Sequence, residues 1–294
     1  MKNIINLIVV CACSFNSILN AQIIFEKIPF ENNVESPIFT SDLLNTINWD
    51  SLKQFCDTTD GHYAYKRIDN LLIKYEYVKQ GRVVDFTIIS FNGKVVEFNY
   101  QSEEVNSTYF DRTVWLEYAH QYLPNLPDNL KLTIIESPKT LKAYYHLLGV
   151  GTHEEYGWIC EYSTIGGATE RRIAVINLLD KRELLLKLLD FSNVYVQLYV
   201  ADALIYDDYI VKQLIEDHKL DKDFAGYLEN TLLTRSEWEK IYNIRDSNQM
   251  VNTCINGTGS YRGHKTSTSE ILNEKSIDEI PQKYNELKQM GYFR

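Results

Sequence analysis

The chain has 294 residues, of which 45% are hydrophobic and 24% are charged, and its formal net charge is −10. This length and composition suit one large or two small globular domains and argue against extensive disorder. The acidity, without any basic cluster, argues against nucleic acid and anionic lipid headgroups as partners, because like charges repel.

The N-terminus has the pattern of an export signal. Lys2 precedes an apolar run over residues 4–12, and the small residue Ala21 offers a cleavage site before Gln22. The apolar run is too short to cross a bilayer, and no later stretch is apolar for long enough either. We therefore expect residues 1–21 to be a signal peptide and the mature protein to be periplasmic or secreted.

The cysteines leave two features open. Residues 10–13 (VCAC) resemble a lipobox with Cys13 as the lipidated residue, which would make the protein a lipoprotein on the envelope. In the mature chain, Cys56, Cys160 and Cys254 could form one disulfide, which export permits. Their spacing does not assign the pair, and free buried cysteine is the alternative.

The first half of the chain predicts an antiparallel sheet. Residues 22–39 carry two prolines and no clear period, and indicate an extended arm. Between residues 71 and 100, apolar and polar side chains alternate in three runs, and Asn92-Gly93 joins the last two. Asn-Gly favours a tight hairpin because both residues tolerate positive φ. The apolar character of residues 130–135 predicts a further strand, which gives three to four strands in all.

Helices are expected on both sides of that fourth strand. Thr108 and Asp111 resemble a capping box before a helix that ends at Pro124. Ser137 followed by Pro138 indicates the start of another helix, because serine caps well and proline suits the first helical position. The expected α+β domain runs over residues 22–165.

The stretch over residues 169–217 has apolar residues at helical spacing and no proline, and predicts two stacked helical hairpins. Within it, residues 171–179 (RRIAVINLL) and 197–205 (QLYVADALI) look like copies of one helix. Short paired helices with small residues at their contacts resemble HEAT-type repeats. The resemblance covers residues 169–217 and implies a helical-hairpin array there, with an ordinary helical bundle as the alternative. We expect residues 166–294 to form an all-α domain that contains this array.

Three pairs predict capped helices in the last part of the chain: Thr234 with Glu237, Ser267 with Glu270, and Ser276 with Glu279. The last helix is expected to end before Gly291. The overall prediction is an α+β protein, with an N-terminal antiparallel sheet and flanking helices followed by the helical array.

The best polar cluster lies in the seam between the two predicted domains. The candidate acid/base residues there are His153, Glu154, Glu155 and Glu161, which Cys254 or His264 could complete. The spacing matches no zinc pattern, with neither H-E-x-x-H nor C-x-x-C, so no metal site is predicted. A capped helix start beside a packed tryptophan explains the same residues without chemistry.

Aromatic side chains in the same seam are the candidate binding residues, namely Tyr156, Trp158 and Tyr162. Tyrosine suits binding surfaces because it joins an apolar ring to a polar tip, but most of the 21 tyrosines are expected to build core and sheet. The glycine-rich residues 256–264 lack the ending of a phosphate-binding loop, and we predict no cofactor.

The leading functional interpretation is a non-enzymatic binding or scaffold protein of the bacterial envelope. It would recognise a protein partner through the helical surface or the tyrosine-rich sheet, and its acidity would favour a basic partner. The alternative is a hydrolase with its site at His153–Glu161. An immunity-type protein that neutralises a toxin fits the same sequence features as the binding module.

Overall fold

A computed structural model describes residues 63–67, 71–78, 85–101, 106–152, 154–158, 167–216, 228–254 and 264–293. The chain divides into two compact units, Met1–Pro124 and Asn125–Arg294. The α+β prediction is confirmed, because an antiparallel sheet in the first unit is followed by helices in the second. The seam predicted at residues 165 and 166 falls inside the second unit.

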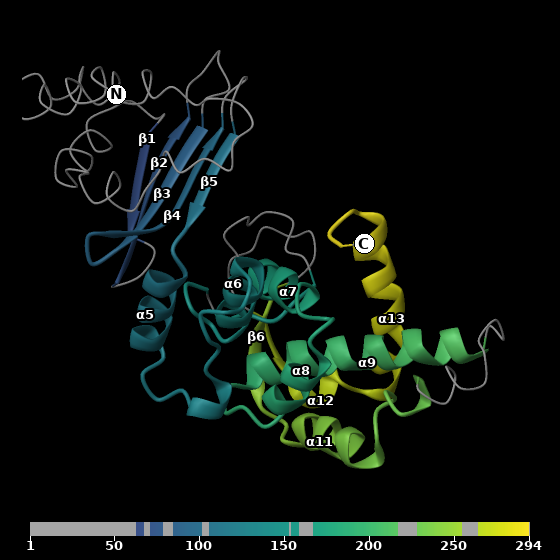
Figure 1. Ribbon diagram of the computed structural model, residues 1–294. Helices are drawn as coiled ribbons and strands as arrows, with labels where there is room; N and C mark the ends of the chain where they lie inside the picture. The colour runs from purple at the N-terminus through teal and green to yellow at the C-terminus, as the bar shows by residue number, and fades with distance from the viewer. Residues whose placement is uncertain are drawn as a thin grey trace, which may run out of the picture. The chain divides into compact units, whose positions relative to one another are not determined.

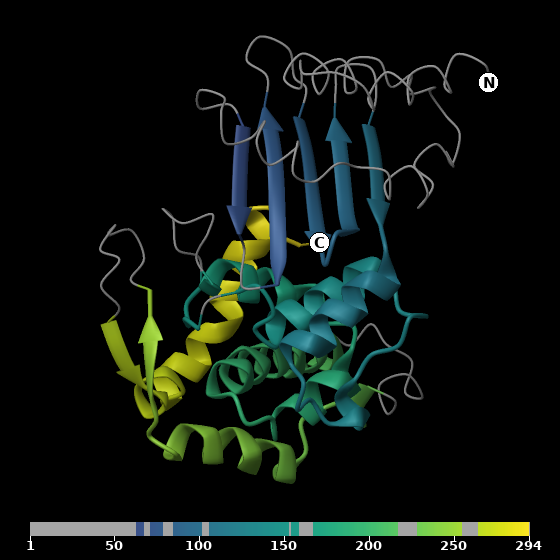
Figure 2. The same cartoon turned by 90° about the vertical axis from the view of Figure 1, so that its left-hand side faces the viewer.

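The first unit contains one antiparallel sheet whose five strands follow one another in chain order (Figure 2). The strands are β1 (Tyr63–Arg67), β2 (Leu72–Val78), β3 (Asp85–Phe91), β4 (Lys94–Gln101) and β5 (Asn106–Phe110). The predicted meander is confirmed as β2, β3 and β4. Asn92 and Gly93 both have positive φ, 48° and 73°, as the tight hairpin requires.

The apolar face of this sheet is buried by α5 (Arg112–Tyr122), the cover that the sequence predicted. The ring of Tyr118 lies 5.4 Å from that of Phe91 in β3, and the two side chains are fully buried. Asp111 alone caps the helix, accepting from the backbone N–H groups of Thr113 and Val114. The predicted capping role of Thr108 is wrong, because Thr108 belongs to β5 and pairs with β4.

The second unit is mainly helical (Figure 1). Its elements are η1 (Asp128–Leu130), α6 (Pro138–Leu147), α7 (Gly167–Ile176), α8 (Arg182–Leu188), α9 (Val194–Glu216), α11 (Arg235–Asp246), β6 (Met250–Thr253), β7 (His264–Ser267), α12 (Thr268–Ile271) and α13 (Glu274–Gln289). None of the helices in the described ranges has both the length and the apolar character needed to cross a membrane.

Residues 130–135 do not form the strand that the sequence predicted. Leu130 ends a 3-10 turn, and Lys131–Thr133 continue without regular structure. Two tyrosines of α6 take the place of a neighbouring strand, because the Tyr144 hydroxyl donates to the Leu130 carbonyl and the Tyr145 hydroxyl accepts from the Leu132 N–H at 3.2 Å. The helix start itself, with Ser137 as N-cap and Pro138 at the first position, is confirmed.

The centre of the second unit is α9, a single helix of 23 residues. The sequence predicted two helices here, which would form the second hairpin, and that prediction is wrong. Asp208 points into the protein, where one carboxylate oxygen accepts from the Leu233 N–H at 2.8 Å and the other pairs with Lys212 at 2.7 Å. The carboxylate therefore anchors a distant segment instead of breaking the helix, and the second predicted hairpin is absent.

Four other helices pack on α9, namely α7, α8, α11 and α13. Its small and branched residues, such as Ala201 and Leu204, are fully buried at these contacts. The expectation that this stretch organises the helical part of the chain is confirmed within the second unit. The last helix, α13, is capped by Asn273 instead of the predicted Ser276, whose backbone N–H donates to Asn273.

Candidate functional site

Of the predicted acid/base residues of the seam, the structure describes Glu154 and Glu155, which contact different partners. Glu154 is exposed, and its carboxylate accepts from the side chain of Asn193, which caps the start of α9. Glu155 contributes its backbone carbonyl to the Tyr199 hydroxyl at 2.9 Å. The remaining candidates of the seam, His153, Cys160, Glu161 and Tyr162, lie outside the described residues, as do Cys13 and Cys56.

Cys254 is disulfide-bonded. A disulfide sulfur lacks the thiolate charge that binds a metal, so Cys254 cannot complete the seam cluster as a thiolate ligand. Among the residues that the structure describes, no group of three or more His, Cys, Asp or Glu side chains is placed to hold a metal ion.

Two of the predicted binding residues, Tyr156 and Trp158, take part in a different arrangement. Both rings face the guanidinium of Arg172, with centroids 5.7 and 3.9 Å from its central carbon. The rings of Tyr199 and Tyr284 face the same group at 4.7 and 5.6 Å. We call these four rings, with Arg172 and its carboxylate partner Asp202, the aromatic cage.

The guanidinium of Arg172 is held by hydrogen bonds from three elements. It donates to the Gly157 carbonyl at 3.1 and 3.3 Å, to the Tyr284 hydroxyl at 3.2 Å and to Asp202 at 2.9 Å. The Arg172 and Asp202 side chains are both fully buried. The cage therefore joins α7, α9, α13 and the segment before α7 around one internal charge pair.

Asp202 receives two donors on one carboxylate oxygen, Oδ2, from Arg172 and from the Tyr156 hydroxyl at 2.7 Å. Its other oxygen, Oδ1, is buried and accepts no hydrogen bond from the described residues. Burial raises the pKa of the Asp202 carboxyl above its ordinary value, and the nearby positive charge of Arg172 opposes that rise. Because neither charged group reaches solvent, the cage is a structural centre and offers no surface to a ligand.

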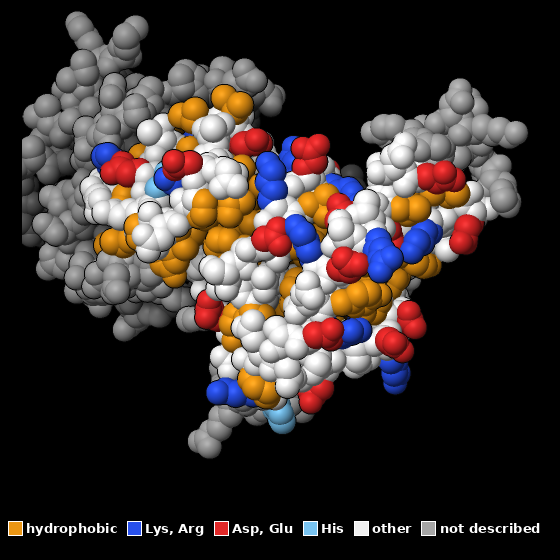
Figure 3. All heavy atoms as spheres, turned by 90° about the horizontal axis from the view of Figure 1, so that it is seen from below, with side chains coloured by type: hydrophobic (Ala, Val, Ile, Leu, Met, Phe, Trp, Pro, Cys, Tyr) orange, Lys and Arg blue, Asp and Glu red, His pale blue; other side chains and the backbone are white. Residues whose placement is uncertain are grey.

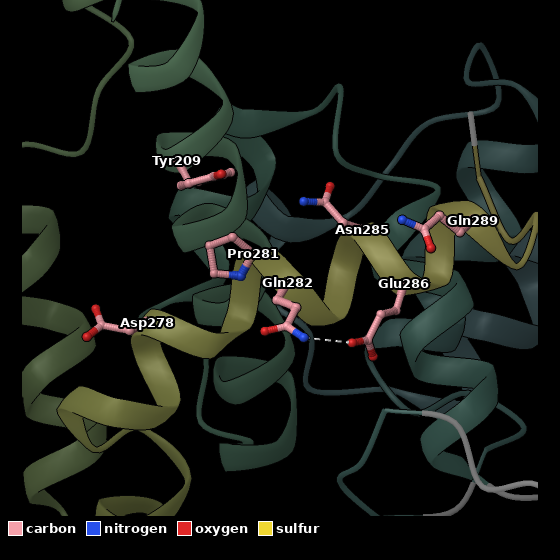
Figure 4. A pocket seen from close by; sticks show the side chains of 7 residues that line it. All are labelled: Tyr209, Asp278, Pro281, Gln282, Asn285, Glu286 and Gln289. Atoms are coloured by element: carbon pink, nitrogen blue, oxygen red, sulfur yellow. Dashed lines mark hydrogen bonds between the residues drawn. The ribbon is translucent and has the colours of Figure 1, made fainter.

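An open groove lies beside the cage, between α9 and α13 (Figure 4). It has a volume of about 500 Å³ and is lined by Tyr209, Asp278, Pro281, Gln282, Asn285, Glu286 and Gln289. Tyr209 projects from α9, and the other six side chains belong to α13 (Figure 4). We call this the α13 groove.

The α13 groove is negatively charged. Asp278 and Glu286 contribute carboxylates, and among the described residues no lysine, arginine or histidine lines it. Lys275 and Lys283 of the same helix both approach Glu279 at 3.7 Å. The lining therefore presents two exposed acidic groups among neutral amides.

The polar groups of the groove are partly oriented by internal bonds. The Gln282 amide donates to the Glu286 carboxylate at 3.1 Å, and the Tyr206 hydroxyl donates to the Asn285 side-chain oxygen at 3.5 Å. The ring of Tyr206 also stacks on Tyr284 of the cage, with centroids 4.5 Å apart and planes inclined by 10°. The groove thus rests directly on the buried cage.

A second groove, of about 770 Å³, lies between the start of α6, the end of α7 and the chain after α13. It is lined by Glu136, Ser137, Lys139, Thr140, Ile176, Asn177, Leu179, Asp180, Lys181, Gly291, Tyr292 and Phe293. Both charge signs occur in this lining. Figure 3 shows the same mixture over another face, where acidic and basic side chains are interspersed among apolar ones.

Neither site was predicted from the sequence. Arg172 and Asp202 are 30 residues apart, and the available signal was a charged residue inside an otherwise apolar helical stripe. The residues of the α13 groove share one face of a helix whose amphipathic pattern was visible, but a solvent-facing row of amides carries no motif. Comparison of the chain with protein-family models, with curated proteins and with solved structures finds no match.

Proposed function

We propose that this chain is an exported, non-enzymatic binding protein of the bacterial envelope that recognises a protein partner through its helical surface. The observation that carries the proposal is the α13 groove, an open depression that combines amides, carboxylates and a tyrosine on two packed helices. Recognition surfaces usually combine aromatic rings with polar groups that fix the orientation of the bound partner.

The support beneath the groove favours recognition by a preformed surface. Tyr284 and Tyr206 stack under it, and Tyr284 is fully buried against Arg172. Binding sites held by rigid secondary structure lose less conformational entropy when a partner docks. A surface built on α9 and α13 is therefore suited to hold a partner without rearrangement.

The disulfide at Cys254 supports the export part of the proposal. Disulfides persist in oxidising compartments such as the periplasm and the extracellular space. We propose cleavage before Gln22 to give a soluble mature protein, with lipidation at Cys13 as the alternative form. The intact mass of the protein purified from the envelope distinguishes the soluble form from the lipidated form, because lipidation at Cys13 adds the mass of acyl chains.

Site-specific photo-crosslinking in the native envelope tests the binding role. A photoreactive residue at position 282, in the groove, is expected to give a discrete adduct with one protein. The control is position 239 on α11, where Glu239 is 58% exposed and lies outside both groove linings. Identical adduct patterns from both positions, or no adduct from position 282, would contradict recognition through this surface.

A further inference from the structure

We propose that the α13 groove binds an extended, basic segment of the partner, with lysine or arginine side chains directed at Asp278 and Glu286. This inference rests on the proposed function and adds the chemistry and spacing of what is recognised. It draws on three features of the lining: the positions of the two carboxylates, the row of amides between and beyond them, and the apolar surface of Tyr209 and Pro281.

The spacing of the carboxylates fits residues i and i+4 of an extended chain. Asp278 and Glu286 are eight residues apart in α13, which at the rise of an α-helix places them about 12 Å apart along its axis. In an extended strand, residues i and i+4 point to the same side and lie about 13 Å apart. The groove therefore matches a segment with basic residues at positions i and i+4.

The amides can bind the backbone of such a segment. Gln282, Asn285 and Gln289 recur at intervals of three and four residues, so they lie along one stripe of α13. Each amide offers both a donor and an acceptor, as a peptide group does. From Asp278 to Gln289 the stripe extends about 16 Å, the length of roughly five extended residues.

The apolar part of the groove suits the stems of long basic side chains. The half-buried ring of Tyr209 on α9 and the buried Pro281 on α13 form the apolar part of the lining, and Tyr209 is the more exposed of the two (Figure 4). Lysine and arginine bury their methylene stems on apolar surface while the charged end stays in water, and their cations are attracted to the face of an aromatic ring. A basic side chain can therefore contact Tyr209 and a carboxylate together.

The charge of the lining selects against acidic segments. Two carboxylates face the groove, the described part of its lining holds no cation, and the neighbouring Lys275 and Lys283 both approach Glu279. The net charge of −10 adds a weaker attraction for basic partners over longer range. Because Asp278 and Glu286 are solvent-exposed, the interaction must weaken as salt is added.

The test uses the full mature chain and fluorescein-labelled peptides of seven residues, followed by fluorescence anisotropy. The first probe carries lysines at positions 2 and 6 in a background of serine and alanine. The second has the same composition with the lysines adjacent, and the third has glutamates in place of lysines. We expect the first to bind most tightly, the second roughly 3- to 10-fold more weakly, and the third undetectably.

Matched variants locate the binding. Asp278→Asn and Glu286→Gln should each weaken binding of the first peptide roughly 2- to 5-fold, and the double variant should abolish the preference for the i, i+4 spacing. Glu239→Gln on α11 removes the same charge outside the groove and should leave binding unchanged. Thermal unfolding of each variant shows that it remains folded. Equal losses from Glu239→Gln and the groove variants would overturn the site.

The remaining outcomes separate this inference from the proposed function. If position 282 crosslinks a partner but the i, i+4 peptide has no advantage, protein recognition stands and the basic extended segment is wrong. If position 282 crosslinks no partner and the i, i+4 peptide has no advantage, both the proposed function and this inference are wrong. Amides, carboxylates and tyrosine also form hydrogen bonds with sugar hydroxyls. If a neutral oligosaccharide binds, no peptide binds, and Asn285→Ala removes the oligosaccharide binding, the inference is overturned in favour of a carbohydrate ligand.

Discussion

The aromatic cage and the α13 groove both include residues of α9 and α13, yet their carboxylates have opposite properties. Asp202 of the cage is fully buried and accepts from Arg172 and Tyr156, whereas Asp278 of the groove is exposed among neutral amides. The comparison shows that the chemical type of a side chain does not determine its role. Its exposure and its internal partners do.

The two regions are also close in the chain, which makes the contrast useful. Tyr206 and Tyr209 lie within seven residues of Asp202 on α9, and Tyr284 of the cage lies between Gln282 and Asn285 of the groove. Changes on the inner faces should therefore affect stability, and changes on the outer faces should affect binding. The predictions below test that division, beginning with the largest expected effect.

Asp202→Ala should lower the free energy of unfolding by about 3–5 kcal/mol, because it leaves the Arg172 charge buried without its carboxylate partner. Urea unfolding measures the loss. Asp190→Ala is the matched control, since Asp190 forms an ion pair with Lys240 at the surface, where such pairs contribute about 0–1 kcal/mol. Similar losses in both variants would show that the cage is not a stabilising centre.

Arg172→Met should make stability depend on pH. Without the guanidinium, burial still raises the pKa of the Asp202 carboxyl, and the rise is opposed by the Tyr156 hydrogen bond and the charge of Lys283 but no longer by Arg172. The folded protein therefore keeps a proton at a pH where the unfolded chain has released it. The free energy of unfolding should then fall as the pH rises above about 4, the ordinary range of aspartate. Urea unfolding between pH 4 and pH 8 measures the slope, and the Arg172→Met/Asp202→Asn double variant should remove it. Parallel curves for the single and double variants would refute the role of Asp202.

Tyr156→Phe should have an intermediate effect. It removes only the 2.7 Å hydrogen bond to Asp202 and keeps the ring over Arg172. A hydrogen bond to a charged group contributes about 1.5–3 kcal/mol, and that is the expected loss in the free energy of unfolding. Tyr242→Phe on α11 is the control, because Tyr242 is 38% exposed and lies outside the cage. A loss below that of the control would mean that the carboxylate is satisfied without Tyr156.

Gln282→Ala should have the smallest effect on stability, within about 0.5 kcal/mol, because the side chain is exposed and its bond to Glu286 lies on the surface. Chemical denaturation checks this. A loss in the free energy of unfolding as large as that of Tyr156→Phe would show that Gln282 contributes to the core. The distinction between a stabilising cage and a binding groove would then be wrong.

Local signals in the sequence predicted local structure well. Asn92-Gly93 predicted the hairpin, and Ser137-Pro138 predicted the start of α6, because each depends on the conformation of a few adjacent residues. Thr234 and Glu237 form the capping box that their spacing indicated. Gly291, with φ of 84°, follows the end of α13 as expected.

Features that depend on distant partners could not be predicted in this way. The second hairpin was predicted in place of one long helix because nothing near Asp208 in the sequence shows that its carboxylate accepts from the Leu233 N–H. Residues 130–135 had the composition of a strand, but tyrosines of α6 satisfy their backbone groups. The cage was missed for the same reason, since its members come from four separate segments. The α13 groove required knowing which side of α13 the rest of the unit leaves uncovered.

The close rings of the cage give the protein an optical signature. Tyr284 lies 4.5 Å from Tyr206 and 5.2 Å from Trp158, and these rings are fixed in asymmetric surroundings. Such rings give near-ultraviolet circular dichroism, which disappears when specific packing is lost even if the helices persist. The chain therefore reports on the order of its own interior without any label, separately from the far-ultraviolet signal of its helices.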